Sequence, residues 1–336
     1  MCTRHSKLLF LLFTIFCMLI TPEKSSAIPY YEGKRMTIIV SGGPGGGNDR
    51  MARVLQKFLP KYIPGKPVIV VQNMPGAGGV LVANHIYGIA KPDGLTIGSP
   101  QRGFPFAQLL KVEGVKFDVT KYSWIGSTAV ESTILGMRSD LPYKTFADLQ
   151  KTKRTLMIGG TAPTESSTQF VFLLQEFLGL NAKMIYYPAS SDVMLAVERK
   201  EIDGRAGSYS SLKSFIERGV VKPIIRGKTS EPGNENLPVD EDLASSKKAK
   251  IFMALRSSIE LIGKPYIAPP NTPPEIMNIL RDAFAKVGKD PELIKVSQKA
   301  DMGYEYISAN ECQKVMNQIF SQPPEIIEEF SKYIKF

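Results

Sequence analysis

The apolar positions of the N-terminal part alternate between short continuous runs and stretches that repeat every three to four residues. Continuous runs are typical of buried strands, and the longer period is typical of helices with one buried face. Strand–helix–strand units of this kind predict a parallel sheet covered by helices. We expect strands at 36–40, 67–72 and 95–99, a helix that Asn48 or Asp49 caps, and a second helix at 80–89.

The same alternation begins again near residue 155, which predicts a second α/β lobe of similar build. Residues 229–250 are polar and are predicted to form a surface loop, in which Asp240-Glu241-Asp242 and the basic patch from Lys247 to Lys250 are solvated. We expect strands at 155–159, 183–187 and 202–207, and helices at 166–178, 192–200, 274–287, 309–320 and 324–333.

Residues 1–27 have the pattern of a cleaved signal peptide. Arg4 and Lys7 precede an apolar run at 8–20, and the small residues at 25–27 resemble a cleavage site. A run of 13 residues is shorter than the roughly 20 that span a bilayer. An N-terminal membrane anchor is the alternative. We therefore expect an exported, periplasmic protein.

Charge and cysteine content narrow the classes of function. The formal net charge of +10 is compatible with an anionic ligand, and the basic residues are scattered rather than clustered, so we expect no nucleic-acid partner. Outside the predicted signal peptide, Cys312 is the one cysteine, which excludes an internal disulfide. We expect this thiol to be a small buried hydrophobe.

A glycine-rich segment joins the first predicted strand to the first predicted helix. Free backbone N–H groups at a helix start, together with its partial positive charge, form an anion site. The segment lacks the Gly-Lys-Ser/Thr of a P-loop and the last glycine of a dinucleotide motif, so we expect no cofactor. A tight structural turn is the alternative. The candidate ligand-binding residues here are Gly43, Pro44, Gly45, Gly46, Gly47 and Asn48.

A second segment, rich in hydroxyl groups, occupies the matching position in the second lobe. Its candidate residues are Thr161, Ala162, Thr164, Ser166 and Ser167. Each could be an ordinary helix-capping residue. Two helix starts, one from each lobe, could instead hold one carboxylate ligand between them.

Catalytic and metal-binding patterns are weak. Outside the predicted signal peptide, His85 is the one histidine, and it lies within a predicted helix. The sequence has no Gly-x-Ser-x-Gly motif, no His/Cys cluster for zinc and no acidic calcium loop. We therefore expect neither an enzyme nor a metal protein.

Several motifs occur in the order and spacing of a known family. They are Gly45 to Arg53, Val70 to Gly79, Pro92-Asp93-Gly94, Trp124-Ile125-Gly126, Tyr187 with Ser190, and Ile267 to Pro273. With them, the chain resembles the extracytoplasmic receptors of tripartite tricarboxylate transporters, the Bug family, from about residue 34 to 320.

The resemblance implies a type II periplasmic-binding-protein fold, with two α/β lobes that close on a ligand. It implies crossings between the lobes near 126–136 and 256–268, with residues 28–130 and 260–336 in lobe I and 131–259 in lobe II. It also adds Ser99, Ser190 and Ser208 to the candidate site. The implied partners are a small carboxylate and the permease subunits of a membrane transporter, and we expect a monomer.

The chain departs from the common family pattern in its first loop. Ser41 and Gly42 stand where many members have proline and an aromatic residue, which leaves the size of the ligand open. Gln101 and Arg102 follow the third predicted strand, and Arg205 ends a strand of the second lobe. One of the two arginines could reach a distal carboxylate, or each could be exposed.

Two other functions remain open at this stage. One is a periplasmic sensor that signals to a membrane kinase. The other is an α/β enzyme that acts on a phosphorylated or nucleotide substrate, which would need a general base that the sequence does not offer.

Overall fold

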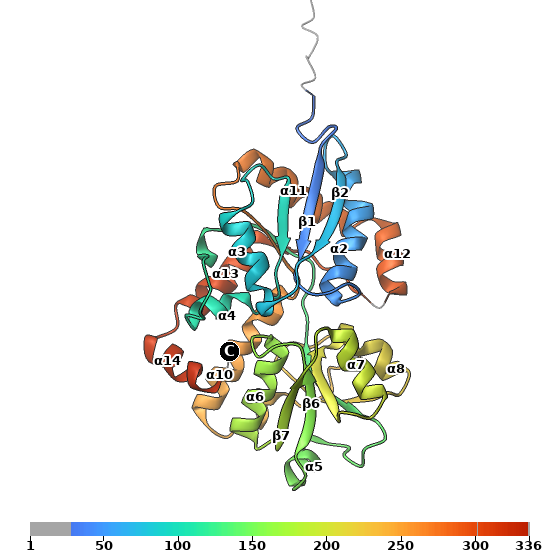
Figure 1. The fold of residues 1–336 in the computed structure, drawn as a ribbon, viewed down its shortest axis with the longest axis vertical. Coiled ribbons are helices and arrows are strands. Elements are labelled where there is room, and N and C mark those ends of the chain that lie inside the picture. The colour runs from blue at the N-terminus through green and yellow to red at the C-terminus, as the bar shows by residue number, and fades with distance from the viewer. Residues whose placement is uncertain (1–27, 301, 335–336) are drawn as a thin grey trace, which may run out of the picture.

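Two β-sheets, each covered by helices, form two lobes that lie end to end along the long axis of the molecule (Figure 1). This computed structural model describes residues 28–300 and 302–334, so the predicted signal peptide lies outside the described residues. The predicted α/β fold with two lobes is confirmed.

The first lobe contains a sheet of mixed direction, with the strand order β11-β4-β10-β3-β1-β2. Strand β1 pairs in parallel with β2 and β3, and β10 runs antiparallel to β3 and β4. The strands are β1 (Arg35–Val40), β2 (Val68–Asn73), β3 (Thr96–Ser99), β4 (Ser123–Ser127), β10 (Pro265–Ala268) and β11 (Ile307–Ser308). The helices that follow these strands are α2 (Gly47–Phe58), α3 (Val80–Gly88), α4 (Phe104–Leu109), α11 (Pro274–Val287), α12 (Pro291–Lys299) and α13 (Ala309–Phe320).

The second lobe has the strand order β7-β6-β8-β5-β9, in which β6 is parallel to β7 and β8. Its strands are β5 (Thr133–Arg138), β6 (Leu156–Gly160), β7 (Ala182–Tyr186), β8 (Gly204–Ser208) and β9 (Val221–Arg226). Its helices are α5 (Phe146–Lys151), α6 (Ser166–Leu178), α7 (Ser190–Glu198), α8 (Tyr209–Glu217), α9 (Asp240–Leu243) and α10 (Lys247–Ser258).

The chain passes between the two sheets in two linkers. Residues 128–132 join β4 to β5, and the 3₁₀ turn Ile259–Ile262 leads from α10 to β10. The last helix, α14 (Pro324–Tyr333), adds a packing contact, because Phe330 lies between Phe106 and Phe252 at ring distances of 5.8 and 5.4 Å. Helices α4 and α10, from opposite lobes, are thus held by one aromatic side chain.

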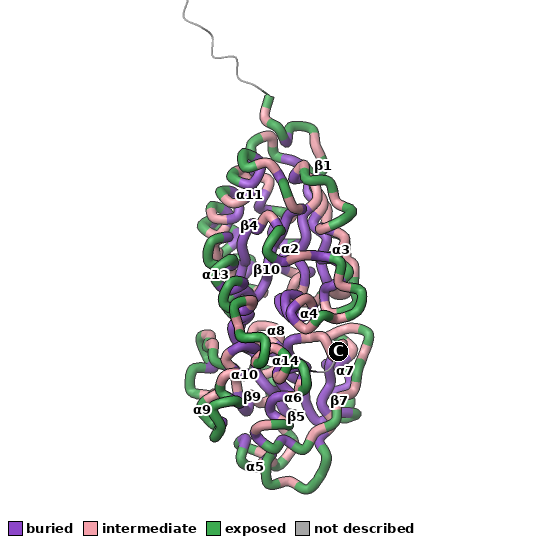
Figure 2. Tube along the Cα trace, turned by 90° about the vertical axis from the view of Figure 1, so that its left-hand side faces the viewer, coloured by how far each residue is buried: buried purple, intermediate pink, exposed green. Residues whose placement is uncertain are grey.

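Strand β1 shows why its apolar run is continuous. Met36, Ile38 and Val40 pack into one cluster with α2 and α11, while Ile39 faces a second cluster that includes Ile86 of α3. Both faces of the strand are therefore buried, as in other sheets covered on two sides. Figure 2 shows buried residues along the strands of both lobes and exposed residues on the outer helix faces.

The prediction of a surface loop at 229–250 is wrong for residues 247–250, which are helical. Helix α10 begins at Lys247, where the Ser246 hydroxyl accepts a hydrogen bond from Ala249 N at 3.1 Å. The predicted solvation of Asp240 is also wrong, because its buried carboxylate lies 3.5 Å from the buried guanidinium of Arg256. Charge in the sequence gave no sign of this tertiary pairing.

No helix among residues 28–300 and 302–334 has both the length and the apolar character needed to cross a bilayer.

Candidate functional site

A cleft of about 390 Å³ lies between the lobes and takes its walls from both of them. This volume is near the lower end of ligand pockets, which run from about 300 to 1,000 Å³. The first lobe contributes the glycine-rich loop, the segment from Pro75 to Gly79, Gln101 and Arg102. The second lobe contributes the starts of α6, α7 and α8, together with Arg205 of β8.

The glycine-rich loop turns from the end of β1 into α2. Gly42 and Gly45 have φ angles of +99° and +80°, which favour glycine. Helix α2 begins at Gly47 without a side-chain cap, so the predicted capping by Asn48 or Asp49 is wrong. Within the described residues, the N–H groups of Gly47, Asn48 and Asp49 have no hydrogen-bond partner, and Gly47 and Asn48 line the cleft. These groups can bind an anion.

Asp49 stabilises this loop from within. Its carboxylate accepts hydrogen bonds from Gly45 N at 2.9 Å, from Arg53 Nε at 3.0 Å and from Asn73 Nδ2 at 2.9 Å. Burial raises the pKa of Asp49, but the hydrogen bonds from Arg53, Gly45 and Asn73 outweigh it and hold the pKa below its ordinary value. The ionised side chain therefore belongs to the scaffold of the loop.

In the second lobe, two helices begin at the cleft with free N–H groups. Helix α6 starts at Ser166, and α7 starts at Ser190 after Ala189. Among the described residues, no acceptor is hydrogen-bonded to the N–H groups of Ser166, Ser167, Ser190 or Ser191. Together with α2, the cleft therefore receives the positive ends of helices from both lobes.

Arg102 joins the lobes at the back of the cleft. Its Nε donates to Ser166 Oγ at 3.2 Å, its Nη1 to Glu131 O at 2.9 Å, and its Nη2 to Thr133 Oγ1 at 2.7 Å. The side chain is buried and also lies 3.4 Å from the Glu131 carboxylate. Its guanidinium is therefore occupied by protein acceptors.

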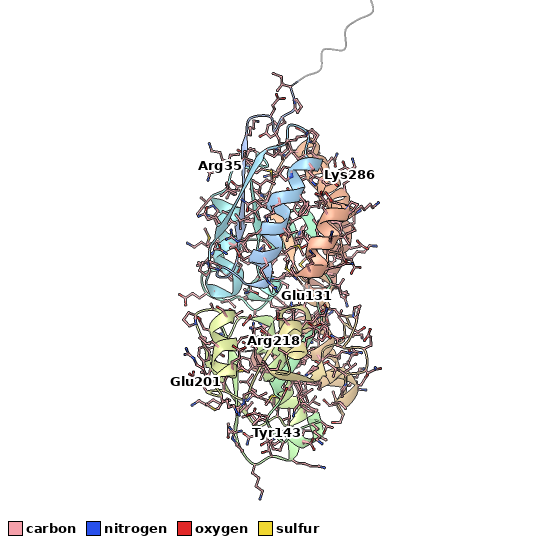
Figure 3. The ribbon with its side chains drawn as sticks, turned by 90° about the vertical axis from the view of Figure 1, so that its right-hand side faces the viewer. Arg35, Glu131, Tyr143, Glu201, Arg218 and Lys286 are labelled. Carbon is pink, nitrogen blue, oxygen red and sulfur yellow. The ribbon has the colours of Figure 1, made fainter. Side chains whose placement is uncertain are left out.

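Glu131 lies at the junction of the two lobes, where Figure 3 labels it. The Lys264 ammonium forms an ion pair with its Oε1, to which Ser210 Oγ also donates at 3.2 Å. Burial raises the pKa of Glu131, but the charges of Lys264 and Arg102 outweigh it and lower that pKa. Lys264, which follows the second linker, and Arg102 of the first lobe thus both contact the ionised carboxylate of Glu131 in the first linker.

Arg205 projects from β8 beside the start of α7. Its Nη1 donates to Ser190 O at 3.0 Å, its Nη2 to Ser190 Oγ at 2.9 Å, and its Nε to Ala206 O at 3.3 Å. Burial lowers the pKa of the guanidinium, and the nearby charge of Glu165 raises it by less. The prediction that Arg205 could be exposed does not describe this structure, since the side chain is buried.

The lobes touch at the rim of the cleft. A Cβ atom on Gly78 would overlap Thr164 Oγ1 of the opposite lobe, and a Cβ on Gly43 would lie 3.9 Å from the Cβ of Ala189. Small residues therefore permit the approach of the two loops.

Most of the candidate residues lie together along this cleft. Ser99 and Thr164 do not line it: Ser99 is fully buried at the end of β3, and its carbonyl accepts from Ser41 N at 3.0 Å. The candidates that line the cleft are Gly43, Pro44, Gly45, Gly46, Gly47, Asn48, Gln101, Arg102, Thr161, Ala162, Ser166, Ser167, Ser190, Arg205 and Ser208.

Other residues that line the cleft were not among the predicted site residues. The segment from Pro75 to Gly79 is also rich in glycine, and that composition could have marked it. Glu131, Ser211 and Phe215 carried no such signal, because their place depends on the packing of the second lobe. In the part of the chain that the structure describes, no three His, Cys, Asp or Glu side chains are grouped to hold a metal ion.

Comparisons with known proteins agree on one family. A family model described as "Tripartite tricarboxylate transporter family receptor" matches residues 51–331. A UPF0065 protein of Agrobacterium vitis, from the ttuE-ttuC' intergenic region, is 30% identical over 286 residues, which cover 82% of this chain and 78% of that protein. A UPF0065 protein of Cupriavidus necator is 26% identical over 309 residues, or 89% of this chain and 88% of that protein.

Solved structures share the fold. The periplasmic binding protein BugD aligns with a TM-score of 0.73 and 21% identity, covering 90% of this chain and 98% of that one. MatC of Rhodopseudomonas palustris with bound malate gives 0.69 and 18%, covering 90% and 99%. Rpa4515 of the same species with adipate gives 0.71 and 17%, covering 89% and 98%.

Proposed function

The chain belongs to the tripartite tricarboxylate transporter receptor family, and from this premise we propose that it captures a small carboxylate between its lobes and delivers it to a membrane permease. The family is one of periplasmic solute-binding receptors. Our proposal adds three points to this family membership: the ligand class, the permease as partner, and export by the signal peptide at 1–27.

One observation carries the proposal: helix starts with unbonded N–H groups reach the same cleft from opposite lobes. Helix α2 supplies them from the first lobe, and α6 and α7 supply them from the second. Carboxylate oxygens accept hydrogen bonds from such groups without needing a buried counter-charge for each oxygen. Malate in MatC and adipate in Rpa4515, both proteins of the same fold, support the choice of a carboxylate.

Binding of this kind drives closure. A ligand that contacts both lobes binds the closed form better than the open form, and that difference in affinity shifts the population toward closure. The contact of Gly78 with Thr164 across the rim supports a closed form in which the loops exclude water from the ligand. The closed receptor is the form that we expect the permease to recognise.

The first experiment is calorimetric titration of residues 28–336 with a panel of organic acids, sugars and cations. We expect at least one carboxylate to bind with micromolar or better affinity. Binding of sugars or cations without any response to an acid would contradict the proposal.

A pair of variants at Gly47 tests the helix N-terminus itself. Gly47 is the first residue of α2, a position that tolerates proline, and Gly46 before it has the extended φ and ψ of −67° and 163° that proline requires. Gly47→Pro removes one N–H from the site, and we expect a loss of affinity of about tenfold or more. Gly47→Ala keeps that N–H and is the control, since a Cβ there meets only Lys264 Cε at 3.9 Å.

A further inference from the structure

A buried cation in the cleft forms no ion pair with any of the described residues. The Arg205 side chain is 6% exposed, yet its three hydrogen bonds go to the carbonyls of Ser190 and Ala206 and to the Ser190 hydroxyl, all neutral acceptors. No ion pair to Arg205 is present among residues 28–300 and 302–334. An unpaired buried charge is costly, so a partner of opposite charge is expected.

The other buried basic side chains of the described residues each have a carboxylate partner. Arg102 lies 3.4 Å from Glu131, and Lys264 forms an ion pair with the same carboxylate. Arg256 lies 2.7 Å from Glu260. The arginine of β8 is thus an exception to the way this protein stabilises buried cations, and it lines the cleft.

The start of α7 adds to the positive potential at Arg205. The guanidinium lies against the first residue of α7, where the helix dipole disfavours a cation and favours an anion. Glu165 is the nearby carboxylate, but it forms no ion pair with the guanidinium. It accepts instead from Thr161 N at 3.1 Å and from Thr161 Oγ1 at 2.8 Å. The position therefore favours an anion supplied from the cleft.

Donors remain for such an anion. A guanidinium has five N–H groups, and the three hydrogen bonds of Arg205 leave some of them free. Ser190 Oγ accepts from Arg205, so its own hydrogen is free to donate. The free N–H groups at the start of α7 lie beside them.

We propose that Arg205, with Ser190, binds a second acidic group of the ligand and so selects dicarboxylates over monocarboxylates of the same length. The inference rests on the proposed function, in which the helix starts hold the first carboxylate. It assigns the selecting role to Arg205 rather than to Arg102, whose guanidinium is satisfied by Glu131, Thr133 and Ser166.

The test compares matched acids on the wild-type chain: succinate with butyrate, glutarate with pentanoate, and adipate with hexanoate, each by calorimetry. We expect at least one dicarboxylate to bind about tenfold or more tightly than its partner. In Arg205→Gln this preference should fall to about threefold or less, while Arg205→Lys should retain part of it. Arg199→Gln, an exposed arginine at the end of α7, is the matched control and should keep the preference.

The outcomes separate the two proposals. Equal binding of dicarboxylates and monocarboxylates by the wild type, or an unchanged preference in Arg205→Gln, would overturn the role of Arg205 and leave the carboxylate receptor standing. Failure of the wild type to bind any acid in the panel would overturn both. If the glutamine variant does not fold, Arg205→Lys replaces it, and a preference in Arg205→Lys as large as that of the wild type would overturn the role of Arg205.

Discussion

Arg102 Nε donates to Ser166 Oγ at 3.2 Å, although the first residue follows a strand of one lobe and the second opens a helix of the other. The same guanidinium reaches Glu131 in the linker and Thr133 at the start of β5. A single side chain therefore connects the wall of the cleft to the hinge.

Replacing Arg102 should destabilise the protein. Arg102→Gln leaves Glu131 with one cation instead of two and removes donors from Thr133 and Ser166. Loss of one partner in a buried, charged network costs about 2–4 kcal/mol. Urea unfolding measures it, with Arg218→Gln as the control, since Arg218 forms a surface ion pair with Glu198 worth about 0–1 kcal/mol. Equal losses in the two variants would show that the interlobe bonds contribute nothing.

A methyl group at Gly78 should oppose closure. Gly78 has a φ of +57°, and a Cβ there would overlap Thr164 Oγ1 of the other lobe. We expect Gly78→Ala to lower ligand affinity about tenfold, because the closed form must shift to admit the methyl group. Calorimetry gives the affinity, and small-angle scattering with saturating ligand should give a larger radius of gyration than the wild type.

Gly88→Ala is the matched control for that variant, since a Cβ at Gly88 meets nothing within 4 Å and its φ is not positive. It should bind ligand like the wild type. Wild-type affinity in Gly78→Ala would mean that the loops do not approach this closely when ligand is bound.

Local signals in the sequence predicted much of the fold. The bounds of α6 and α11 are as expected, because Gly179 ends the first in a left-handed conformation and a proline begins the second. Helix α10 was not predicted, because it begins with Lys247 and Lys248 and its apolar positions come only after these two residues. Its place is decided by packing on α6, which no local pattern encodes.

Some residues of the candidate site could likewise be predicted from local signals, and others could not. The glycine-rich loop and the start of α6 carry local signals, so both could be found without a structure. The difference between Arg102 and Arg205 could not, because it depends on Glu131, which belongs to a linker far away in the sequence. A counter-charge from a distant segment leaves no local trace beside the arginine that it neutralises.

Replacing Asp49 tests what stabilises the glycine-rich loop. Asp49→Ala removes the acceptor for Gly45 N–H, Arg53 and Asn73, and we expect a loss of about 2–3 kcal/mol in unfolding free energy together with weaker ligand binding. Asp49→Asn keeps the shape without the charge and should lose less. If Asp49→Ala binds ligand as well as the wild type, the loop does not need this carboxylate to present its N–H groups.

The hydrogen bonds of Asp49 also set the sign of its pH dependence. Its folded-state pKa lies below the ordinary value, so its contribution to stability is present at neutral pH and is lost as the pH falls through the folded pKa. The difference in unfolding free energy between the wild type and Asp49→Asn should therefore shrink in acid. A difference that stays constant down to about pH 3 would show that the charge of Asp49 plays no part.

Glu231 should have the opposite pH dependence. Its Oε1 accepts from Ser132 N at 2.7 Å, next to the hinge. Burial and the charge of Glu131 raise its pKa to about 7, and the hydrogen bond from Ser132 N, together with the charges of Lys264 and Arg102, offsets this only in part. Because the folded state holds this proton more tightly than the unfolded state, stability should fall as the pH rises from about 5 to 7.5, by roughly 1–3 kcal/mol.

Glu231→Gln isolates that contribution, because the glutamine oxygen can still accept from Ser132 N while the charge is gone. We expect the variant to match the wild type near pH 5 and to exceed it in unfolding free energy near pH 8, by about the amount that the wild type loses. Burial raises the pKa of Asp240 to about 6. Asp240 titrates in both proteins, so its contribution to the unfolding free energy cancels in the difference between them. An equal difference in unfolding free energy between the wild type and Glu231→Gln at the two pH values would show that Glu231 titrates as it does in the unfolded chain.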